Sequence, residues 1–224
     1  MKINAKQFDA IARTVFAPVY PVIAEQIIFH TGITRGTCLD LGCGSGYLGA
    51  AVARKTKLDM VFLDQSPEML KLCARTIDEN GLRGRAGLLP GDTGSIALPD
   101  GSVDLVISRG SIFFWEDLPQ AFREIKRVLA PGGKTFIGGG FGNALLKQSI
   151  RLQMAERNQG KDQFGQKMRT NLGAEMRNRF EKNLHQAGIS NYSILHDEDI
   201  GLWIMMEQPA TPAVNKETGC IGAQ

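Results

Sequence analysis

The sequence predicts an α/β fold in which a mostly parallel sheet carries helices on both faces. Short apolar segments of strand length alternate along the chain with segments of helical spacing, and short loops connect them. This alternation is typical of parallel sheets, because the crossover between two parallel strands has room for a helix. A chain of 224 residues with 43% hydrophobic residues has the length and apolar content of one folded domain.

Seven short apolar segments bounded by turn residues are expected to form the strands. The first ends directly in a glycine-rich loop, and the fifth follows the turn sequence Pro131-Gly132-Gly133. The strands are expected at residues 37–41, 60–63, 86–89, 103–108, 134–137, 192–195 and 202–206.

Segments with apolar residues at helical spacing alternate with these strands. In the first, Pro18 and Pro21 interrupt the pattern and predict two short helices joined by a kink. Ser66 and Pro67 predict a helix start, because serine caps free N–H groups and proline at the first helical position loses no hydrogen bond. Gly81 is expected to end that helix. The helices are expected within residues 5–30, 47–56, 66–80 and 118–129, and over most of 143–187.

The composition excludes several classes of protein. A net charge of +3 and 22% charged residues argue against intrinsic disorder, and no apolar run approaches the length that spans a bilayer. The first residues lack the pattern of a signal peptide, and three of the four cysteines lie where small core residues are expected. We therefore expect a cytoplasmic protein that does not bind a membrane.

We expect one domain over residues 1–207. Its N-terminal helices, within 1–35, are expected to cap it, and residues 143–187 are expected to form a helical, lid-like insertion. Residues 208–224 are rich in Pro, Thr and Gly and are expected to form a flexible tail, in which Cys220 can be a free thiol.

The segment Asp40-Leu41-Gly42-Cys43-Gly44-Ser45-Gly46 joins the first predicted strand to a helix. Glycines at this place let the backbone approach a ligand closely and expose N–H groups at the start of the helix. Residues 44–49 also match the GxGxxG pattern of dinucleotide sites, and Asp64 follows Gly44 by twenty residues. NAD is therefore one candidate ligand.

Two features favour a different ligand. The carboxylate of Asp40, at the strand end before the glycines, would repel a pyrophosphate but can hold an ammonium group. The end of the chain has no recognisable catalytic domain for hydride transfer. A ligand with an amino-acid cation at one end and a nucleoside at the other fits better, and S-adenosylmethionine is such a ligand.

Four segments carry a resemblance to a known family. They are CLDLGCGSGYLG at 38–49, FLDQSPEML at 62–70, LLPGDTGSIALPDGSVDLVISRG at 88–110 and FREIKRVLAPGGKTF at 122–136. In their order and spacing the chain resembles class I S-adenosylmethionine-dependent methyltransferases of the UbiE-like, small-molecule type. The resemblance implies a Rossmann-like, doubly wound, seven-stranded sheet, mostly parallel with an antiparallel last strand. It also implies S-adenosylmethionine as cofactor and S-adenosylhomocysteine as product.

The resemblance further implies which residues bind the cofactor. Gly42, Gly44 and Gly46 would line its methionine portion, and Asp40 would orient its amino group. Asp64 would accept hydrogen bonds from both ribose hydroxyls, since a carboxylate can accept two at once. Together these residues would fix the amino-acid and ribose portions of the cofactor.

Other residues would surround the adenine and the reacting atoms. Gln65 and Met69 would flank the adenine, although a methionine at helical spacing is equally a core residue. Asp92, with the backbone of Thr93, would meet the adenine amino group. The residues implied near the sulfonium and the acceptor are Ser108 and Arg109.

The sequence defines no catalytic residue and no cluster at metal-ligand spacing. Methyl transfer is an in-line displacement, for which alignment and exclusion of water suffice unless the acceptor must lose a proton. Arg109 and Tyr20 are candidates. Arg109 follows the fourth strand but is equally interpreted as half of a surface ion pair. Tyr20, with Phe8 and Phe16, lies on the N-terminal helices that can cover the acceptor.

The segment 108–117 bears on the identity of the acceptor. It lacks the Asn/Asp-Pro-Pro-Tyr/Phe arrangement with which related enzymes grip adenine or a glutamine amide, which argues against DNA as a substrate. Phe113, Phe114 and Trp115 can wall a substrate pocket, although packing between helix and sheet is the more common use of such clusters.

The segment 143–185 is basic, with nine Lys/Arg against four Asp/Glu in a chain whose net charge is +3. A basic lid can admit an anionic small molecule or dock on RNA or an acidic partner, whereas charges scattered along helices commonly only solvate one face. We expect a methyltransferase with a small-molecule acceptor. The alternatives are an RNA or protein methyltransferase that docks through 143–187, and a cofactor-binding protein without transferase activity.

Overall fold

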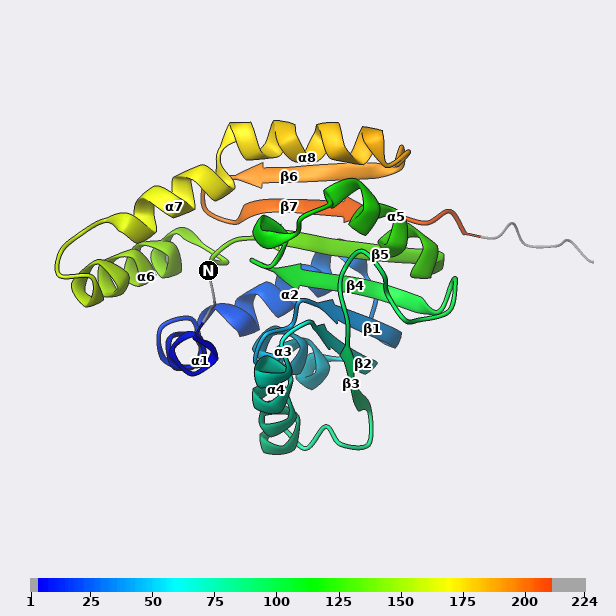
Figure 1. Cartoon of the computed structure of the whole chain (residues 1–224), viewed down its shortest axis with the longest axis horizontal. Coiled ribbons are helices and arrows are strands. Elements are labelled where there is room, and N and C mark those ends of the chain that lie inside the picture. Colours follow the sequence, from blue (N-terminus) through cyan, green and yellow to red (C-terminus); the bar gives the residue numbers. More distant parts are fainter. Residues whose placement is uncertain (1–3, 211–224) are drawn as a thin grey trace, which may run out of the picture.

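A seven-stranded sheet forms the centre of the computed structural model, which describes residues 4–210 (Figure 1). The strands are β1 (Arg35–Leu41), β2 (Lys57–Asp64), β3 (Ala86–Pro90), β4 (Val103–Arg109), β5 (Leu129–Gly139), β6 (Tyr192–Asp197) and β7 (Gly201–Met206). Their order is β3-β2-β1-β4-β5-β7-β6, and all neighbours are parallel except that β7 runs antiparallel to both β5 and β6. The predicted fold class is therefore confirmed.

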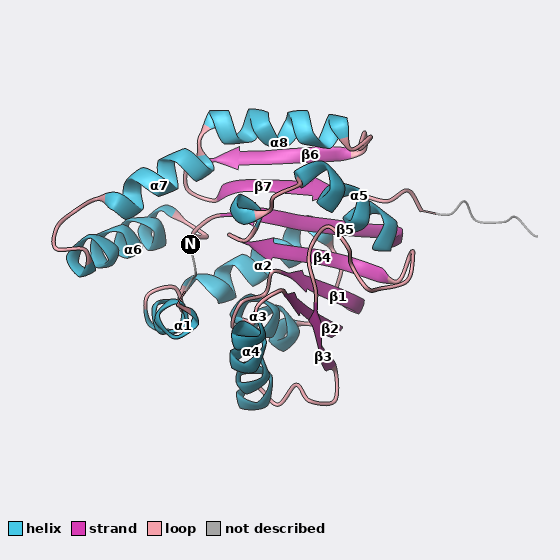
Figure 2. Ribbon diagram, viewed as in Figure 1, coloured by secondary structure: helices cyan, strands magenta, loops and turns pink. Residues whose placement is uncertain are grey.

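Helices cover both faces of the sheet (Figure 2). Successive side chains of β1 point into two different cores: Cys38 packs in the core that includes α2 and α3, and Leu39 in the core that includes α5 and α8. The helices are α1 (Ala5–Thr14), α2 (Val19–Thr31), α3 (Tyr47–Lys55), α4 (Pro67–Glu79), the short 3₁₀ helix η1 (Ile112–Phe114), α5 (Leu118–Val128), α6 (Ala144–Arg157), α7 (Gln163–Leu172) and α8 (Ala174–Gln186).

The kink predicted near the N-terminus is present, because α1 and α2 meet at 78°. Pro18 occupies the N-cap position of α2, and Pro21 lies in the first turn of that helix. The N–H groups of a first turn have no partner within the helix, so a proline there loses no hydrogen bond. Within residues 4–210 no single helix is long and apolar enough to cross a membrane, and the pair α1 and α2 meets that test only when its sharp bend is ignored. The predicted tail lies outside the described residues from position 211 onward, and Cys220 with it.

The connection from α5 into β5 differs from the prediction. The sequence Pro131-Gly132-Gly133 was expected to form a turn before a strand that starts at Lys134, but β5 already begins at Leu129. Val103 of β4 pairs with Leu129, and the next pair joins Leu105 to Lys134, so the turn residues form a bulge within the strand. Gly133 is required there, since a Cβ atom would lie 2.8 Å from the carbonyl oxygen of Ala130.

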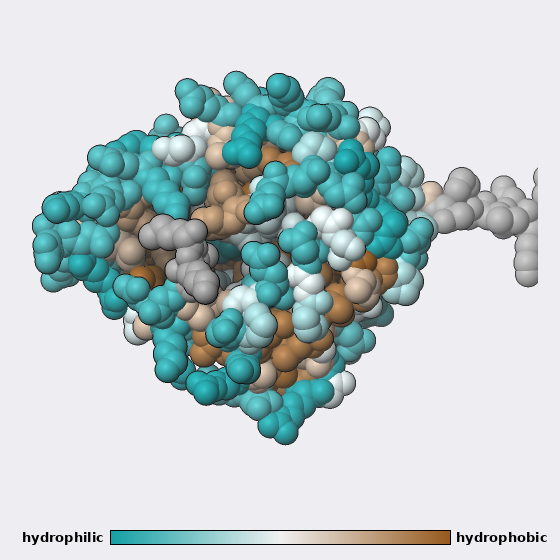
Figure 3. Space-filling model, in the orientation of Figure 1, coloured by the Kyte–Doolittle hydropathy of each residue, from teal (hydrophilic) through white to brown (hydrophobic). Residues whose placement is uncertain are grey.

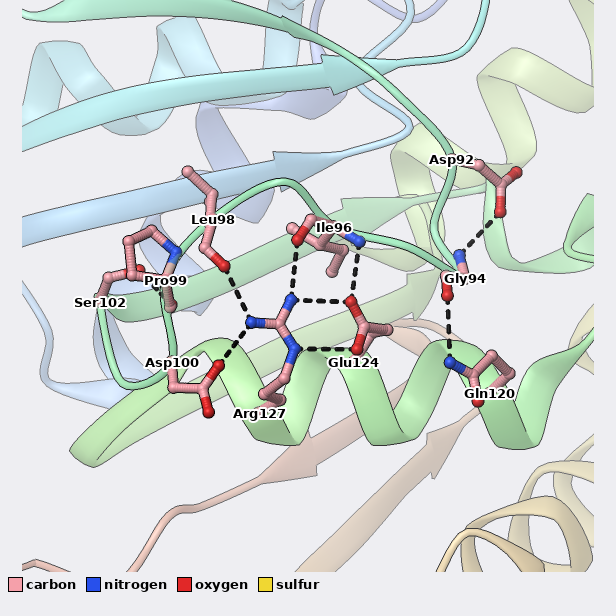
Figure 4. A network of polar contacts seen from close by, with 10 residues as sticks. All are labelled: Asp92, Gly94, Ile96, Leu98, Pro99, Asp100, Ser102, Gln120, Glu124 and Arg127. Atoms are coloured by element: carbon pink, nitrogen blue, oxygen red, sulfur yellow. Dashed lines mark hydrogen bonds and ion pairs between the residues drawn. The ribbon is translucent and has the colours of Figure 1, made fainter.

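The long loop between β3 and β4 is fixed to α5 by Arg127 (Figure 4). Its guanidinium donates hydrogen bonds to the carbonyls of Ile96 (2.7 Å) and Leu98 (2.8 Å) in the loop. It also donates to the carboxylates of Asp100 (2.7 Å) and Glu124 (2.8 and 2.9 Å). All five N–H groups of the guanidinium are thereby used. Hydrogen bonding to Glu124 and Asp100 raises the pKa of Arg127 above its ordinary value.

The same loop is held at a second point, close to two of the predicted site residues. Gln120 donates to the carbonyl of Gly94 (3.1 Å), and the N–H of Gly94 donates to the carboxylate of Asp92 (2.7 Å) (Figure 4). The helix α5 therefore positions the segment that contains Asp92 and Thr93.

Replacement of Arg127 by methionine is expected to lower the free energy of unfolding by about 2 kcal/mol or more. Hydrogen bonds with charged groups contribute about 1.5–3 kcal/mol each when shielded, but the side chain of Arg127 is 30% exposed and water weakens each of them. Denaturant unfolding measures the loss. The matched control is Arg123→Met on the same helix, because Arg123 is exposed and, within residues 4–210, hydrogen-bonds only to Gln120 (3.1 Å). Equal stability of the two variants would contradict a structural role of Arg127.

Candidate cofactor and acceptor site

The candidate site lies where the carboxyl ends of β1 and β4 meet. Asp40 of β1 pairs with Ile107 of β4 in a parallel register, so the loops that follow the two strands lie side by side. The strand order reverses at this point, since β2 and β3 lie on one side of β1 and β4 on the other. Open α/β sheets bind ligands at such a place.

The three glycines of the loop after β1 all have positive φ angles, of 68° for Gly42, 54° for Gly44 and 78° for Gly46. A Cβ atom at Gly42 would lie 2.5 Å from Ser111, and one at Gly46 would lie 2.6 Å from the sulfur of Cys73. Packing within the protein thus explains these two glycines. At Gly44 the nearest atom would be a ring carbon of Phe8, at 3.5 Å. Gly44 is the glycine that leaves room for a ligand.

Asp64 joins this loop to the end of β2. One carboxylate oxygen accepts the N–H of Gly44 (2.9 Å), and the other accepts the N–H of Ser66 (2.9 Å). Each carboxylate oxygen can accept a second hydrogen bond, so the side chain can still receive two hydroxyl donors. This geometry is compatible with the ribose contact predicted for Asp64.

Asp40 is almost completely buried beneath the loop. One of its oxygens accepts the N–H of Gly49 (3.0 Å). Burial raises the pKa of Asp40 to about 7, the hydrogen bond from Gly49 acts against this rise, and the nearby Asp64 adds to it. A cation placed beside Asp40 would stabilise its charged form.

Ser45 provides an independent indication of a ligand. Its hydroxyl oxygen is buried, and it finds no hydrogen-bond partner among residues 4–210. An unpaired buried hydroxyl costs about 1–3 kcal/mol, which a bound polar group can offset. Together with the unblocked Cβ position at Gly44, this hydroxyl makes the loop a candidate binding site for a polar group. Ser45 was not among the residues predicted from the sequence, although its place between two glycines was a usable signal.

The residues predicted around the adenine begin from two adjacent strand ends. Asp64 pairs with Pro90 in the parallel register of β2 and β3, so the loop with Asp92 starts beside Asp64. Asp92 is exposed, and Thr93 is half-buried. Past the end of β2, Gln65 is exposed and Met69 is buried at the start of α4, where its N–H donates to Ser66 (3.3 Å) as the predicted cap requires.

Ser108 lies at the end of β4 and is completely buried. Its hydroxyl lies 2.6 Å from that of Ser111, which donates to the carbonyl of Leu41 (2.9 Å) and accepts the indole N–H of Trp115 (3.1 Å). Ser111, which the sequence did not single out, thus ties the loop after β4 to the end of β1. The predicted contact of Ser108 with the reacting atoms stays a prediction.

Arg109 is surrounded by aromatic rings. The carbon of its guanidinium lies 5.0 Å from the ring centre of Phe16, 5.5 Å from that of Phe141 and 5.6 Å from that of Tyr20. Its Nε–H donates to the carbonyl of Gly140 (3.0 Å). Within the described part of the chain no carboxylate forms an ion pair with it, so a surface ion pair, one of the two interpretations of the sequence, is not what the structure shows.

Tyr20 links Arg109 to the glycine loop. Its ring centre lies 5.6 Å from that of Tyr47, the first residue of α3. Burial raises the pKa of Tyr20 to about 12, with the charge of Arg109 acting in the opposite direction. The phenol therefore stays protonated at neutral pH, which makes Tyr20 a hydrogen-bond donor rather than a general base.

The helix α1 lies over the glycine loop. Phe8 is the residue nearest to the open side of Gly44. The hydroxyl of Tyr47 donates to Asp9 (2.9 Å), and Arg13 forms an ion pair with Glu79 of α4 (3.5 Å). That the N-terminal helices cover the cofactor and the acceptor stays a prediction.

The segment 143–187 reaches the aromatic wall around Arg109 through Phe164 of α7. Its ring centre lies 6.1 Å from that of Phe16 and 6.0 Å from that of Phe141.

The three aromatic residues at 113–115 do not act together as one pocket wall. Trp115 is buried, and the ring of Phe113 stacks on that of Phe180 of α8, with 6.1 Å between the ring centres. Phe114 is 59% exposed. Among the described residues no group of three or more His, Cys, Asp or Glu side chains could hold a metal ion.

Comparison with known proteins identifies the family. Residues 39–137 match the methyltransferase domain family. The crystal structure of a candidate S-adenosyl-L-methionine-dependent methyltransferase from Methanococcus maripaludis is 40% identical, covers 96% of this chain and 100% of that one, and has a TM-score of 0.88. The uncharacterized methyltransferase YdaC of Bacillus subtilis is 33% identical over 129 residues, which are 57% of this chain and 69% of that protein.

A malonyl-[acyl-carrier protein] O-methyltransferase of Methylococcus capsulatus is 36% identical over 132 residues, but the match covers only 45% of that protein. The fold, the site and these relatives together show that the chain belongs to the class I S-adenosylmethionine-dependent methyltransferases. S-adenosylmethionine, and not NAD, is therefore the cofactor. The UbiE-like subtype stays a prediction.

The pKa of Asp40 predicts how cofactor affinity depends on pH. The ammonium group of the cofactor pairs with the ionised form of Asp40. Below pH 7 the carboxyl group must therefore lose its proton when the cofactor binds. The affinity for S-adenosylhomocysteine should then fall by up to about tenfold for each unit by which the pH is lowered. Without ligand, the raised pKa means that the folded protein binds more protons than the unfolded chain between about pH 4 and 7. Stability of the ligand-free protein should therefore fall as pH rises through that window.

Calorimetric titration from pH 6 to 8 and thermal unfolding measure the two opposite trends. Asp40→Asn is the matched variant, because it keeps the shape of the side chain and removes its titration. An unchanged pH dependence in this variant would exclude Asp40 as its source.

Gly44→Val is expected to abolish binding of S-adenosylhomocysteine while the protein stays folded, because the added side chain would occupy the open space beside Phe8. Gly81→Val is the control for backbone strain. Gly81 has a similar φ angle of 65°, lies at the end of α4, and a Cβ atom there would meet nothing within 4 Å. Calorimetry and circular dichroism of both variants check the result; retained binding by Gly44→Val would place the ligand elsewhere.

Proposed function

We propose that the protein transfers the methyl group of S-adenosylmethionine to a small-molecule acceptor by in-line displacement. The observation that carries this proposal is the wall of aromatic side chains around Arg109, beside the glycine loop. Its rings come from Phe16, Tyr20 and Phe141, and Phe164 packs behind them. Apolar walls of this kind are typical of sites that enclose small molecules.

In this proposal the cofactor is held by the residues of the β1 and β2 loops. Asp40 would pair with the ammonium group, and Asp64 would accept hydrogen bonds from the ribose hydroxyls. The hydroxyl of Ser45 would form a hydrogen bond with the amino-acid portion. Gln65, Met69, Asp92 and Thr93 would surround the adenine. The cofactor supplies a methyl group on a positively charged sulfur, which leaves as the neutral thioether of S-adenosylhomocysteine.

The protein contributes mainly alignment and exclusion of water. The aromatic rings limit access of water to the reacting atoms, and a dry site strengthens the electrostatic interactions within it. Tyr20, which stays neutral, would donate a hydrogen bond to the acceptor. We further propose that α1 and α2 form a cap within one domain over residues 1–207. Of the lid predicted over 143–187 we retain α6 and α7, because Phe180 and Leu184 of α8 are buried in the core against the sheet.

The basic segment supports docking on RNA or protein less well. Hydrophilic side chains dominate the surface over α6–α8 (Figure 3), but several of its cations are paired within the chain. Arg151 (2.8 Å) and Arg169 (3.4 Å) both contact Asp162, and Arg177 contacts Glu181 (2.9 Å). Such pairing favours the interpretation that these charges solvate the helices.

Calorimetric titration with S-adenosylmethionine, S-adenosylhomocysteine and NAD tests the cofactor site. We expect micromolar binding of the first two, no binding of NAD, and a loss of about tenfold or more in Asp64→Ala, the equivalent of about 1–3 kcal/mol for charged hydrogen bonds. Asp78→Ala is the control, because Asp78 is paired with Arg83 on the surface of α4. Equal affinities in the two variants would remove Asp64 from the site.

Transfer of a tritiated methyl group to fractions of a cell extract tests the acceptor class. We expect label in the small-molecule fraction, with no label in RNA or protein. Label confined to RNA or protein would overturn the small-molecule proposal and support docking through 143–187. No label in any fraction, with intact cofactor binding, would favour a cofactor-binding protein without transferase activity.

A further inference from the structure

Arg109 has unused hydrogen-bonding capacity in a place where such capacity is costly. A guanidinium has five N–H groups, and in Arg109 only the Nε–H finds an acceptor within residues 4–210, the carbonyl of Gly140. Arg127, in contrast, uses all five. Arg109 is only half-buried, so its terminal nitrogens keep some contact with accessible space.

The surroundings of Arg109 would strengthen an interaction with an anion. The rings of Phe16, Tyr20 and Phe141 attract the guanidinium through their faces, but they accept no hydrogen bonds from the N–H groups at its edge. They also replace water around the charge, and Coulomb attraction increases as the local dielectric falls. The guanidinium stays charged at neutral pH.

The position of Arg109 places this charge beside the transfer site. Arg109 ends β4, next to the loop after β1, and Tyr20 connects it to Tyr47 at the start of α3. All three of its rings, on Phe16, Tyr20 and Phe141, lie outside residues 39–137, the part that matches the methyltransferase domain family. The wall around Arg109 therefore belongs to the covering elements rather than to the common cofactor-binding part.

Building on the proposed function, we infer that Arg109 binds a carboxylate of the methyl acceptor, so that the substrate class is a small carboxylic acid with an apolar or aromatic body. A carboxylate accepts two parallel N–H groups of a guanidinium, and the apolar body of the acid would rest on the surrounding rings. The positive sulfur of the cofactor would also favour an anion at this point. The amino-acid end of the cofactor would be held instead by Asp40 and by the start of α3, where the helix dipole favours a carboxylate.

Matched pairs of acids and amides test this inference. Phenylacetate, benzoate and hexanoate, each beside its amide, are titrated calorimetrically into the protein saturated with S-adenosylhomocysteine. We expect at least one acid to bind at least tenfold more tightly than its amide, and Arg109→Met to remove that difference. Arg109→Lys keeps the charge but not the two parallel donors and should retain only part of it. Equal binding of acid and amide, or no binding of any pair, overturns the inference.

A second arm identifies which carboxylate Arg109 holds. S-adenosylhomocysteine carries a carboxylate, whereas methylthioadenosine lacks the whole amino-acid portion. We expect the affinity of Arg109→Met for both nucleosides to stay within about threefold of the wild type. A loss of more than tenfold for S-adenosylhomocysteine alone would assign Arg109 to the cofactor and overturn the inference. Failure of the wild type to bind S-adenosylhomocysteine would instead refute the proposed function.

Discussion

The parallel pairing of β1 with β4 is the constraint on which the site depends. It brings the glycine loop after β1 to the same edge of the sheet as residues 108–115, which form the end of β4 and the loop that follows it. Ser111 then bonds to the carbonyl of Leu41, and its side chain fills the space that a Cβ atom at Gly42 would need. The conformation of the loop and the position of Arg109 thus follow from one register between two buried strands.

Local patterns in the sequence were sufficient for the fold and for the approach of the glycine loop to the end of the second strand. Asp64 and Gly44 are only twenty residues apart, and the segment between them shows the pattern of a loop, a helix and a strand in unbroken order. Their proximity at the ends of two neighbouring strands could therefore be predicted. The bulge at 130–133 could not, because the pattern of a turn sequence is the same inside a strand as before it. Its position depends on the pairing with β4.

The acceptor side was harder to predict because its contacts join distant parts of the chain. Arg109 was a candidate from its place after the fourth strand, but the rings of Phe16 and Phe141 are brought to it only by the packing of α1, α2 and β5. Ser111 and Leu41 are likewise seventy residues apart. No local pattern encodes such contacts, and they depend on side-chain packing rather than on the periodicity of any one element.

The way in which α1 is attached bears on how ligands exchange. Within this helix only Ala12 is fully buried, and its polar contacts with the rest of the protein, through Asp9, Arg13 and Thr14, lie near the surface. Segments with little buried apolar area open locally at a free-energy cost far below that of global unfolding. Detachment of α1 would uncover Gly44 and, through the adjoining Phe16, loosen the ring nearest to Arg109, while the sheet stays folded. Access to the cofactor and the integrity of the acceptor wall are thereby linked through a single, weakly held helix.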